Sequence, residues 1–317
     1  MNDFDWNRKM ESYLSLRDAL GFSDHAVRLL LQDFVNYLEQ HQLTPPIRAQ
    51  WAVDWACEAS AQRGASGKSI RLSAARGFLI HLKAAFPDTE IPDYNLLAVP
   101  RRSHPYLFSE EEISGMLMVA AQLGPTGRLR PHTIQTLLGL MASTGLRTRE
   151  ALNLLITDVQ LDSIPPRLLI RKTKFGKSRW VPLHQTTAER LRQYVALRQQ
   201  LQYAGLSEVF FISEQGKKLD HESVLKTFHR LMGRLNVKPR EGQRRPTLHS
   251  LRHSFAVNRL RAWYEAGADA RALSHHLSVY LGHLNPAATY WYFTATPELL
   301  GAAAVLFERY AEKGGSK

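Results

Sequence analysis

Six side chains in four separated segments of the sequence have the residue types needed for chemistry on a phosphate ester. The segments read STGLRTREAL, RLLIRKTKFGKSRWVPL, TLHSLRHSFAV and LGHLNPAATYWYF. The side chains are Arg147, Lys174, His249, Arg252, His283 and Tyr292. A phosphodiester resists attack because it is anionic and its leaving alkoxide is poor. Fixed cations together with a protein nucleophile can overcome both obstacles.

Two arginines could hold the non-bridging oxygens of such a phosphate through their forked donors. A tyrosine hydroxyl could then attack phosphorus and form a covalent intermediate, which conserves the energy of the broken bond for resealing without ATP. The other chemical solution, a pair of metal ions, needs clustered carboxylates. Asp158 and Asp162 lie near an expected turn and have no matching acidic cluster. The sequence therefore predicts no metal site and no cofactor.

These residues also have ordinary structural interpretations. Arg147 and Glu150 could form a surface ion pair one helical turn apart. Lys172 or Lys177 could take the place of Lys174, because the whole segment is rich in lysine. The histidines could cap a helix or fill a core, and the histidine beside Arg252 is expected to be structural.

The two tyrosines of the last segment compete for the role of nucleophile. Pro286 suits the first turn of a helix, so residues 286–293 are expected to form a short one. On that helix Tyr290 and Tyr292 would point about 200° apart, so only one of them could face the arginines.

The composition points to a polyanion as partner. The chain has 317 residues and a formal net charge of +12, with 44% hydrophobic residues. Each phosphate that such a surface neutralises releases condensed counterions. Cys57 is the single cysteine, which excludes a disulfide framework. No apolar stretch has the length of a membrane span or a signal-peptide core, so we expect a cytoplasmic protein without a membrane partner.

The elements that must position these side chains are mainly helical. Residues 1–86 have apolar residues at helical spacing and are expected to form a bundle of about four helices. Residues 87–106, rich in proline and turn residues, predict an extended linker before a second domain over 107–317. In that domain Ser109 and Glu112 predict a capping box. The lysine-rich segment predicts a β-hairpin, and EVFFIS at 208–213 a further strand. The expected fold class is mainly α, of the α+β type, with a small antiparallel sheet.

In order, local motif and approximate spacing, the four segments resemble the tyrosine recombinase (phage integrase) family. The motifs are TGLRxxE, the TKxGKxRxVPL hairpin, HxLRH, and LGH followed by a tyrosine. The resemblance covers residues 107–300 strongly. It implies a site-specific DNA recombinase or integrase, Xer-like and similar to those of transposon-like mobile elements. A type IB-like topoisomerase and a non-catalytic DNA-binding relative are the alternatives.

The resemblance also implies roles at the phosphate. Arg147 and Arg252 would hold the scissile phosphate, and His283 would hydrogen-bond it. The family spacing after LGH selects Tyr292 rather than Tyr290 as the nucleophile, which would leave a 3′-phosphotyrosine.

Three further residues would support that reaction. Lys174 would deliver a proton to the leaving 5′ oxygen, and His249 would assist proton movement at the nucleophile. Glu150 would orient an arginine or the start of a helix.

Double-stranded DNA carrying a specific recombination site is the partner that the resemblance implies. The N-terminal bundle, a SAM-like core-binding domain, and the catalytic domain would form a clamp around the duplex. Four protomers would assemble on two DNA sites, with or without a partner recombinase or accessory protein. The basic residues expected to contact DNA are Lys68, Arg71, Arg101, Arg102, Lys172, Lys177, Arg179, Arg244 and Arg245.

Overall fold

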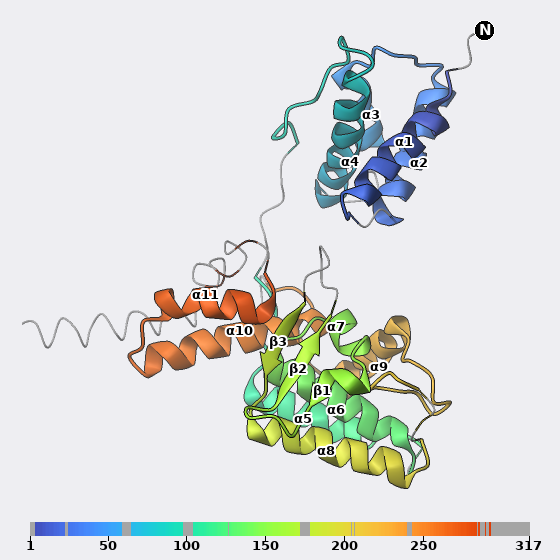
Figure 1. The fold of residues 1–317 in the computed structure, drawn as a ribbon. Coiled ribbons are helices and arrows are strands. Elements are labelled where there is room, and N and C mark those ends of the chain that lie inside the picture. The colour runs from blue at the N-terminus through green and yellow to red at the C-terminus, as the bar shows by residue number, and fades with distance from the viewer. Residues whose placement is uncertain are drawn as a thin grey trace, which may run out of the picture. The chain divides into compact units, whose positions relative to one another are not determined.

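The structure is a computed structural model, and it describes residues 4–22, 25–58, 65–97, 104–125, 127–171, 178–203, 205, 207–239, 243–283, 285, 289 and 292. The chain divides into two compact units, Met1–Arg102 and Ser103–Lys317 (Figure 1). Each unit has its own hydrophobic core. Helices dominate both, with a small antiparallel sheet in the second, so the expected fold class is confirmed.

The first unit packs its described helices around one apolar core. Asp5 begins the first helix by accepting the backbone N–H of Arg8 at 2.8 Å. Aromatic side chains from all four of these helices fill the core, among them Trp6, Phe34, Trp55 and Phe78. The helices are α1 (Trp6–Ala19), α2 (His25–Gln40), α3 (Ala49–Glu58) and α4 (Ala65–Lys83).

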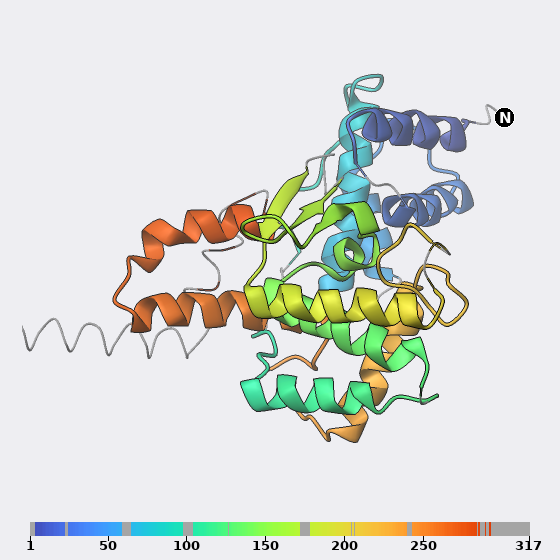
Figure 2. The ribbon, with the colours of Figure 1, turned by 60° about the horizontal axis from the view of Figure 1, so that its bottom comes forward.

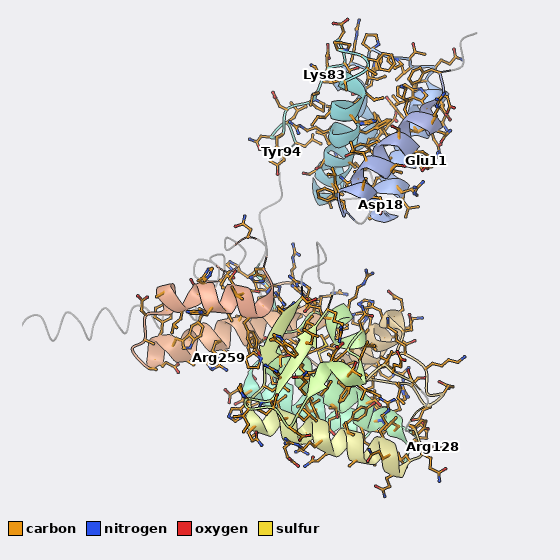
Figure 3. The ribbon with its side chains drawn as sticks, viewed as in Figure 1. Glu11, Asp18, Lys83, Tyr94, Arg128 and Arg259 are labelled. Atoms are coloured by element: carbon orange, nitrogen blue, oxygen red, sulfur yellow. The ribbon has the colours of Figure 1, made fainter. Side chains whose placement is uncertain are left out.

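One basic residue expected on the surface of this unit lies inside it. Whereas Glu11 and Asp18 lie on the outside (Figure 3), the Arg71 side chain is only 4% exposed. Its Nη1 pairs with Asp33 Oδ2 at 2.5 Å and its Nη2 donates to the Trp55 carbonyl at 3.0 Å. The guanidinium also lies 3.9 Å from the centroid of the Trp55 ring. Arg71, which the sequence assigned to DNA contact, is thus buried and directs both terminal nitrogens of its guanidinium at partners within the bundle.

Arg71→Ala is expected to destabilise the first unit by about 2–3 kcal/mol, since it removes a buried charge-assisted network and the packing of a long side chain. Urea unfolding of the full chain measures this loss. Lys68→Ala, in the same helix and only half-buried, is the matched control and should change the free energy of unfolding by less than about 0.5 kcal/mol. Equal small effects of both substitutions would contradict a structural role for Arg71.

The second unit begins with the capping box expected from the sequence. The Glu112 backbone N–H donates to Ser109 Oγ at 3.1 Å, and the Ser109 N–H donates to Glu112 Oε2 at 2.9 Å. From there, α6 contacts α5, α8 and α10 (Figure 2). The apolar side chains of α6 form much of the main core. The helices are α5 (Glu110–Ala121), α6 (Leu129–Thr144), α7 (Thr148–Leu152), α8 (Gln185–Gln200), α9 (His221–Arg234), α10 (Leu248–Glu265) and α11 (Ala270–Leu281).

The expected hairpin arms pair as predicted. After a 3-10 turn, Ile156–Asp158, the sheet runs in the order β1-β2-β3 with antiparallel neighbours. Leu168 pairs with Val181, and both side chains are buried against the core. The strands are β1 (Val159–Gln160), β2 (Arg167–Ile170) and β3 (Arg179–Pro182). The hairpin tip, residues 172–177, lies outside the described residues.

The segment EVFFIS does not form the further strand that we expected. It makes isolated bridges, at Val209 to Leu155 and at Ile212 to Lys218. The buried side chain of Arg198 donates to the carbonyls of Ser207, Val209 and Phe210 at 2.8–2.9 Å. A guanidinium thus satisfies carbonyls that a neighbouring strand would otherwise pair.

The last described helices form an antiparallel pair. α10 and α11 lie side by side in both views (Figures 1 and 2) and enclose a small second core with Tyr292. This pair carries the HxLRH and LGH motifs. Within the part of the chain that the structure describes, no helix is both long and apolar enough to cross a membrane.

Candidate active site

Arg147 lies at the junction between α6 and α7. Helix α6 ends at Gly145, whose φ of 64° is left-handed, and Arg147 is the residue that begins α7. Its backbone N–H donates to Glu150 Oε2 at 3.0 Å and its Nη1 to Glu150 Oε1 at 2.8 Å. Its Nη2 donates to the Gly282 carbonyl at 3.0 Å. The side chain remains 37% exposed, so it is both fixed and accessible.

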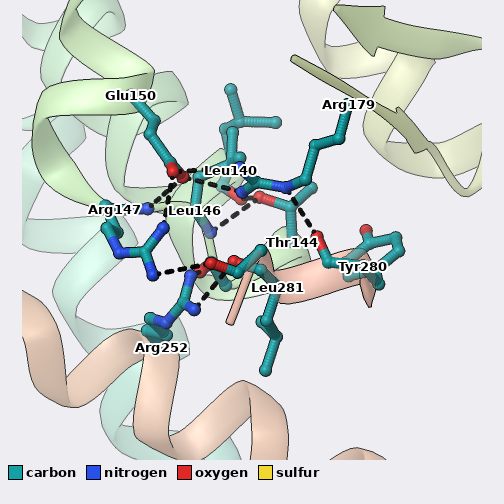
Figure 4. Close-up of polar contacts among 11 residues, drawn as sticks. Leu140, Thr144, Leu146, Arg147, Glu150, Arg179, Arg252, Tyr280 and Leu281 are labelled. Atoms are coloured by element: carbon teal, nitrogen blue, oxygen red, sulfur yellow. Dashed lines mark hydrogen bonds and ion pairs between the residues drawn. The ribbon is translucent and has the colours of Figure 1, made fainter. Parts of the chain in front are cut away.

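Arg252 approaches the same junction from α10 and is almost fully buried (Figure 4). Its Nη1 donates to the Gly145 carbonyl and its Nη2 to the Leu281 carbonyl, each at 2.8 Å. Burial, followed by the charge of Arg147, lowers the pKa of Arg252 to about 10, so the guanidinium stays charged at neutral pH. A guanidinium has five N–H donors. Each arginine directs two of its side-chain N–H donors at protein partners in these contacts, which leaves others for an anion between them.

Glu150 connects this pair to the sheet through Arg179. Arg179 donates from Nη1 to Glu150 Oε1 at 3.0 Å and from Nη2 to Glu150 Oε2 at 2.8 Å (Figure 4). Its Nε donates to the Tyr280 carbonyl at 2.9 Å, and its side chain is only 11% exposed. Arg179, which the sequence assigned to DNA contact, is thus largely buried and paired within the second unit. Its guanidinium instead fixes β3 to α7 and to the end of α11.

The glycine of LGH is required by this arrangement. Gly282 has a φ of 68°, a conformation that side-chain-bearing residues rarely adopt. A Cβ atom there would lie 2.7 Å from Arg179 Nη1. The close approach brings the Gly282 carbonyl within reach of Arg147.

Tyr292 and three histidines lie beside the arginines. Tyr292 is 2% exposed, and its hydroxyl lies 2.9 Å from His253 Nδ1. The His283 ring stacks on the Tyr292 ring with centroids 6.4 Å apart, and its Nδ1 lies 2.6 Å from Thr289 Oγ1. His249, exposed in the first turn of α10, contacts the His253 ring edge-to-face at 4.6 Å.

Burial sets the protonation states of this cluster. It raises the pKa of Tyr292, although the charges of Arg252 and Arg147 act in the opposite direction. Burial, aided by neighbouring histidine and arginine charges, lowers the pKa of His253 to about 3, and burial with arginine charges lowers that of His283 to about 3. The tyrosine is therefore a phenol and both histidines are neutral at pH 7.

The structure brings together most, but not all, of the residues that the sequence singled out. Arg147, Glu150, His249, Arg252, His283 and Tyr292 surround one junction. Lys68 is half-buried, and Arg244 and Arg245 are exposed. The candidates that lie outside the described residues are Lys172, Lys174, Lys177, Arg101, Arg102 and Tyr290.

His253 was expected to be structural, yet it contacts the hydroxyl of the proposed nucleophile. The sequence HSLRHSF could have identified His253 as a candidate, because His249 and His253 are four residues apart and share a helix face. Among the residues described, no three His, Cys, Asp or Glu side chains come together as they would around a metal ion.

Comparison with known proteins agrees with this arrangement. The phage integrase family model matches residues 108–298. The chain is 38% identical over 309 residues to the putative integrase/recombinase y4rB of Sinorhizobium fredii, which covers 96% of this chain and 97% of that protein. It is 28% identical over 300 residues to the tyrosine recombinase XerA of Thermococcus kodakarensis, with 94% of each chain covered.

Solved structures share the fold. The XerH site-specific recombinase bound to palindromic difH substrate superposes with a TM-score of 0.67 at 19% identity, over 96% of this chain and 85% of that one. The Tn1549 transposon integrase in complex with transposon right end DNA gives a TM-score of 0.64 at 18% identity, over 96% of this chain and 99% of that one. With the family model matching well over half of its length, the chain belongs to the phage integrase family and is a tyrosine-type site-specific DNA recombinase.

Proposed function

We propose that this recombinase cleaves and rejoins DNA through a covalent 3′-phosphotyrosine on Tyr292, without metal ions or ATP. The observation that carries the proposal is that the Tyr292 hydroxyl lies 2.9 Å from His253, the neighbour in α10 of Arg252, and that Arg252 and Arg147 meet at the junction of α6 and α7. Two fixed guanidinium groups can stabilise the charge that develops on the non-bridging oxygens. The phosphotyrosine bond then keeps the energy needed for resealing.

The remaining groups have roles in the same reaction. Lys174 protonates the leaving 5′ oxygen, His283 hydrogen-bonds the phosphate, and His249 assists proton movement. The tyrosine oxygen–phosphorus bond forms as the bond from phosphorus to the 5′ oxygen breaks, so a free 5′ hydroxyl remains. Glu150 holds Arg147 in place.

The DNA is expected to contact both units. Exposed Arg244 and Arg245, in the loop before α10, are suited to phosphate contacts. Relatives that act on DNA, such as the XerH recombinase with its difH substrate, support duplex DNA as the partner. For strand exchange we propose four protomers on two DNA sites, with or without a partner recombinase or accessory protein.

The test uses nicked duplexes that tile the DNA on both sides of the gene, incubated with protein in EDTA. Wild-type protein is expected to give an adduct that survives SDS, Tyr292→Phe none, and Tyr290→Phe the same amount as wild type. If only Tyr290→Phe fails to form the adduct, the nucleophile is Tyr290 rather than Tyr292. An adduct that forms only with added Mg²⁺ would overturn the metal-free mechanism.

A further inference from the structure

The hydroxyl of Tyr292 is held by a histidine other than the one expected from the sequence. His253 Nδ1 lies 2.9 Å from the hydroxyl oxygen, and the two rings meet edge-to-face with centroids 5.6 Å apart. That distance is within the range in which a base can take a proton directly. A buried phenol and a half-buried imidazole thus form a preassembled proton-transfer pair.

The neighbouring histidines are placed for other tasks. His283 Nδ1 is engaged with Thr289 Oγ1 at 2.6 Å, while its ring face lies against Tyr292. The exposed ring of His249 contacts the His253 ring edge-to-face, and it is His253 Nδ1 that lies 2.9 Å from the tyrosine hydroxyl.

We propose that His253 Nδ1 accepts the proton of the Tyr292 hydroxyl as that oxygen attacks the scissile phosphorus. The proposal rests on the proposed function and revises the role of His249 within it. His253 must then carry its own proton on Nε2 before the reaction, and it becomes an imidazolium as the oxygen–phosphorus bond forms. The proton returns to the tyrosine oxygen when the strand is rejoined.

The same pair can be inactive until DNA binds. In the free protein burial keeps the pKa of Tyr292 high and that of His253 low, so the proton stays on the tyrosine. A phosphate between the two arginines would bring a negative charge close to the imidazolium and favour its formation. The titratable and charged groups that act on His253 are His249, Arg252, His283 and Arg244.

The test compares His253→Asn with His249→Asn in single-turnover adduct formation on the nicked duplex. Asparagine keeps a polar side chain but is not a base at these pH values. At pH 7 we expect His253→Asn to slow adduct formation by about 10²–10⁴-fold and His249→Asn to slow it less. The rate of His253→Asn should then rise about tenfold per pH unit between pH 7 and 9, because solvent must remove the phenol proton.

Two further measurements separate a base from a merely structural residue. Added imidazole should partly restore the rate of His253→Ala and leave that of His249→Ala unchanged. A substrate with sulfur in place of the bridging 5′ oxygen needs no proton on its leaving group, because a thiol is far more acidic than an alcohol. With that substrate, His253→Asn should still form the adduct more slowly than wild type.

Several outcomes would overturn the proposal. A wild-type rate and pH profile for His253→Asn, beside a strong defect in His249→Asn, would return the role to His249 and leave the proposed function standing. Full restoration by the sulfur substrate would place His253 at the leaving group. If wild-type protein itself gives no adduct on any duplex, the proposed function and this proposal fail together.

Discussion

Arg252→Lys is expected to slow covalent adduct formation by about 10²–10³-fold, because it removes forked donors from the developing charge on the phosphate. A lysine ammonium has three donors on a single nitrogen, so it cannot hold both the Gly145 and Leu281 carbonyls as the guanidinium does and still present donors to the phosphate. The rate constant for adduct formation with saturating protein measures the loss.

The net charge is unchanged in this substitution, so DNA affinity should change little. Arg245→Lys is the matched control, since Arg245 is exposed and its expected contact is with the DNA backbone. It should leave the cleavage rate of bound DNA unaltered. Because Arg252 also supports two carbonyls, the variant is expected to lose about 1–3 kcal/mol of stability, and the assay must be run well below its melting temperature. A cleavage rate within twofold of wild type would mean that Arg252 is structural only.

The parts of the site that sequence could predict depend on local rules. The Ser109–Glu112 capping box, the left-handed end of α6 at Gly145 and the two hairpin arms are all determined by residues close together in the chain. These local features determine where each helix or strand begins and ends, and therefore where on it the motif residues lie. The spacing of His249 and Arg252 on one turn of α10 is of the same kind.

The two arginines that were assigned to DNA contact but are buried in ion pairs show the limit of those rules. Arg71 pairs with Asp33, 38 residues away, and Arg179 with Glu150, 29 residues away. In a single sequence such arginines look like any other surface charge, because the partner is known only once the helices and strands are packed. Helix α4 illustrates the same point, since its apolar residue Ile70 is 59% exposed.

The contact made by His253 could not be predicted for a different reason. Its position on the helix face was visible, but its target, Tyr292, comes from a segment 39 residues later in the chain. A helix face identifies which residues act together, whereas the tertiary fold decides what they contact. Arg252, His253 and Tyr292 therefore had to be placed by the packing of α10 against α6 and of α11 against α10.

Glu150 is expected to contribute both to the stability of the second unit and to the position of Arg147 in the site. It accepts from the backbone and side chain of Arg147 and from both terminal nitrogens of Arg179, and its side chain is 9% exposed. Burial alone would raise the pKa of Glu150, but the hydrogen bonds and charges of Arg179 and Arg147 outweigh it and lower the pKa to about 2. The carboxylate is therefore ionised wherever the protein is folded at ordinary pH.

Glu150→Gln is expected to destabilise the second unit by about 3 kcal/mol at pH 7, since about 1.4 kcal/mol corresponds to each tenfold change in the acid constant between about 4.5 and about 2. It should also slow adduct formation by up to about 10²-fold, because the Arg147 guanidinium loses the partner that aligns it. Arg147 and Arg179 would then face each other without a compensating charge.

The pH dependence distinguishes this charge network from simple packing. Because the folded pKa of Glu150 lies below the unfolded value, its contribution is complete above about pH 5 and is lost as the pH falls toward 2. Wild-type and Glu150→Gln proteins should therefore differ most at pH 7 and converge in acid. The free energy of unfolding of each, measured in urea from pH 7 down to the lowest pH at which wild type folds, checks this. A difference that stays constant over that range would mean that glutamine disturbs packing alone, and that the arginines do not depend on the carboxylate charge.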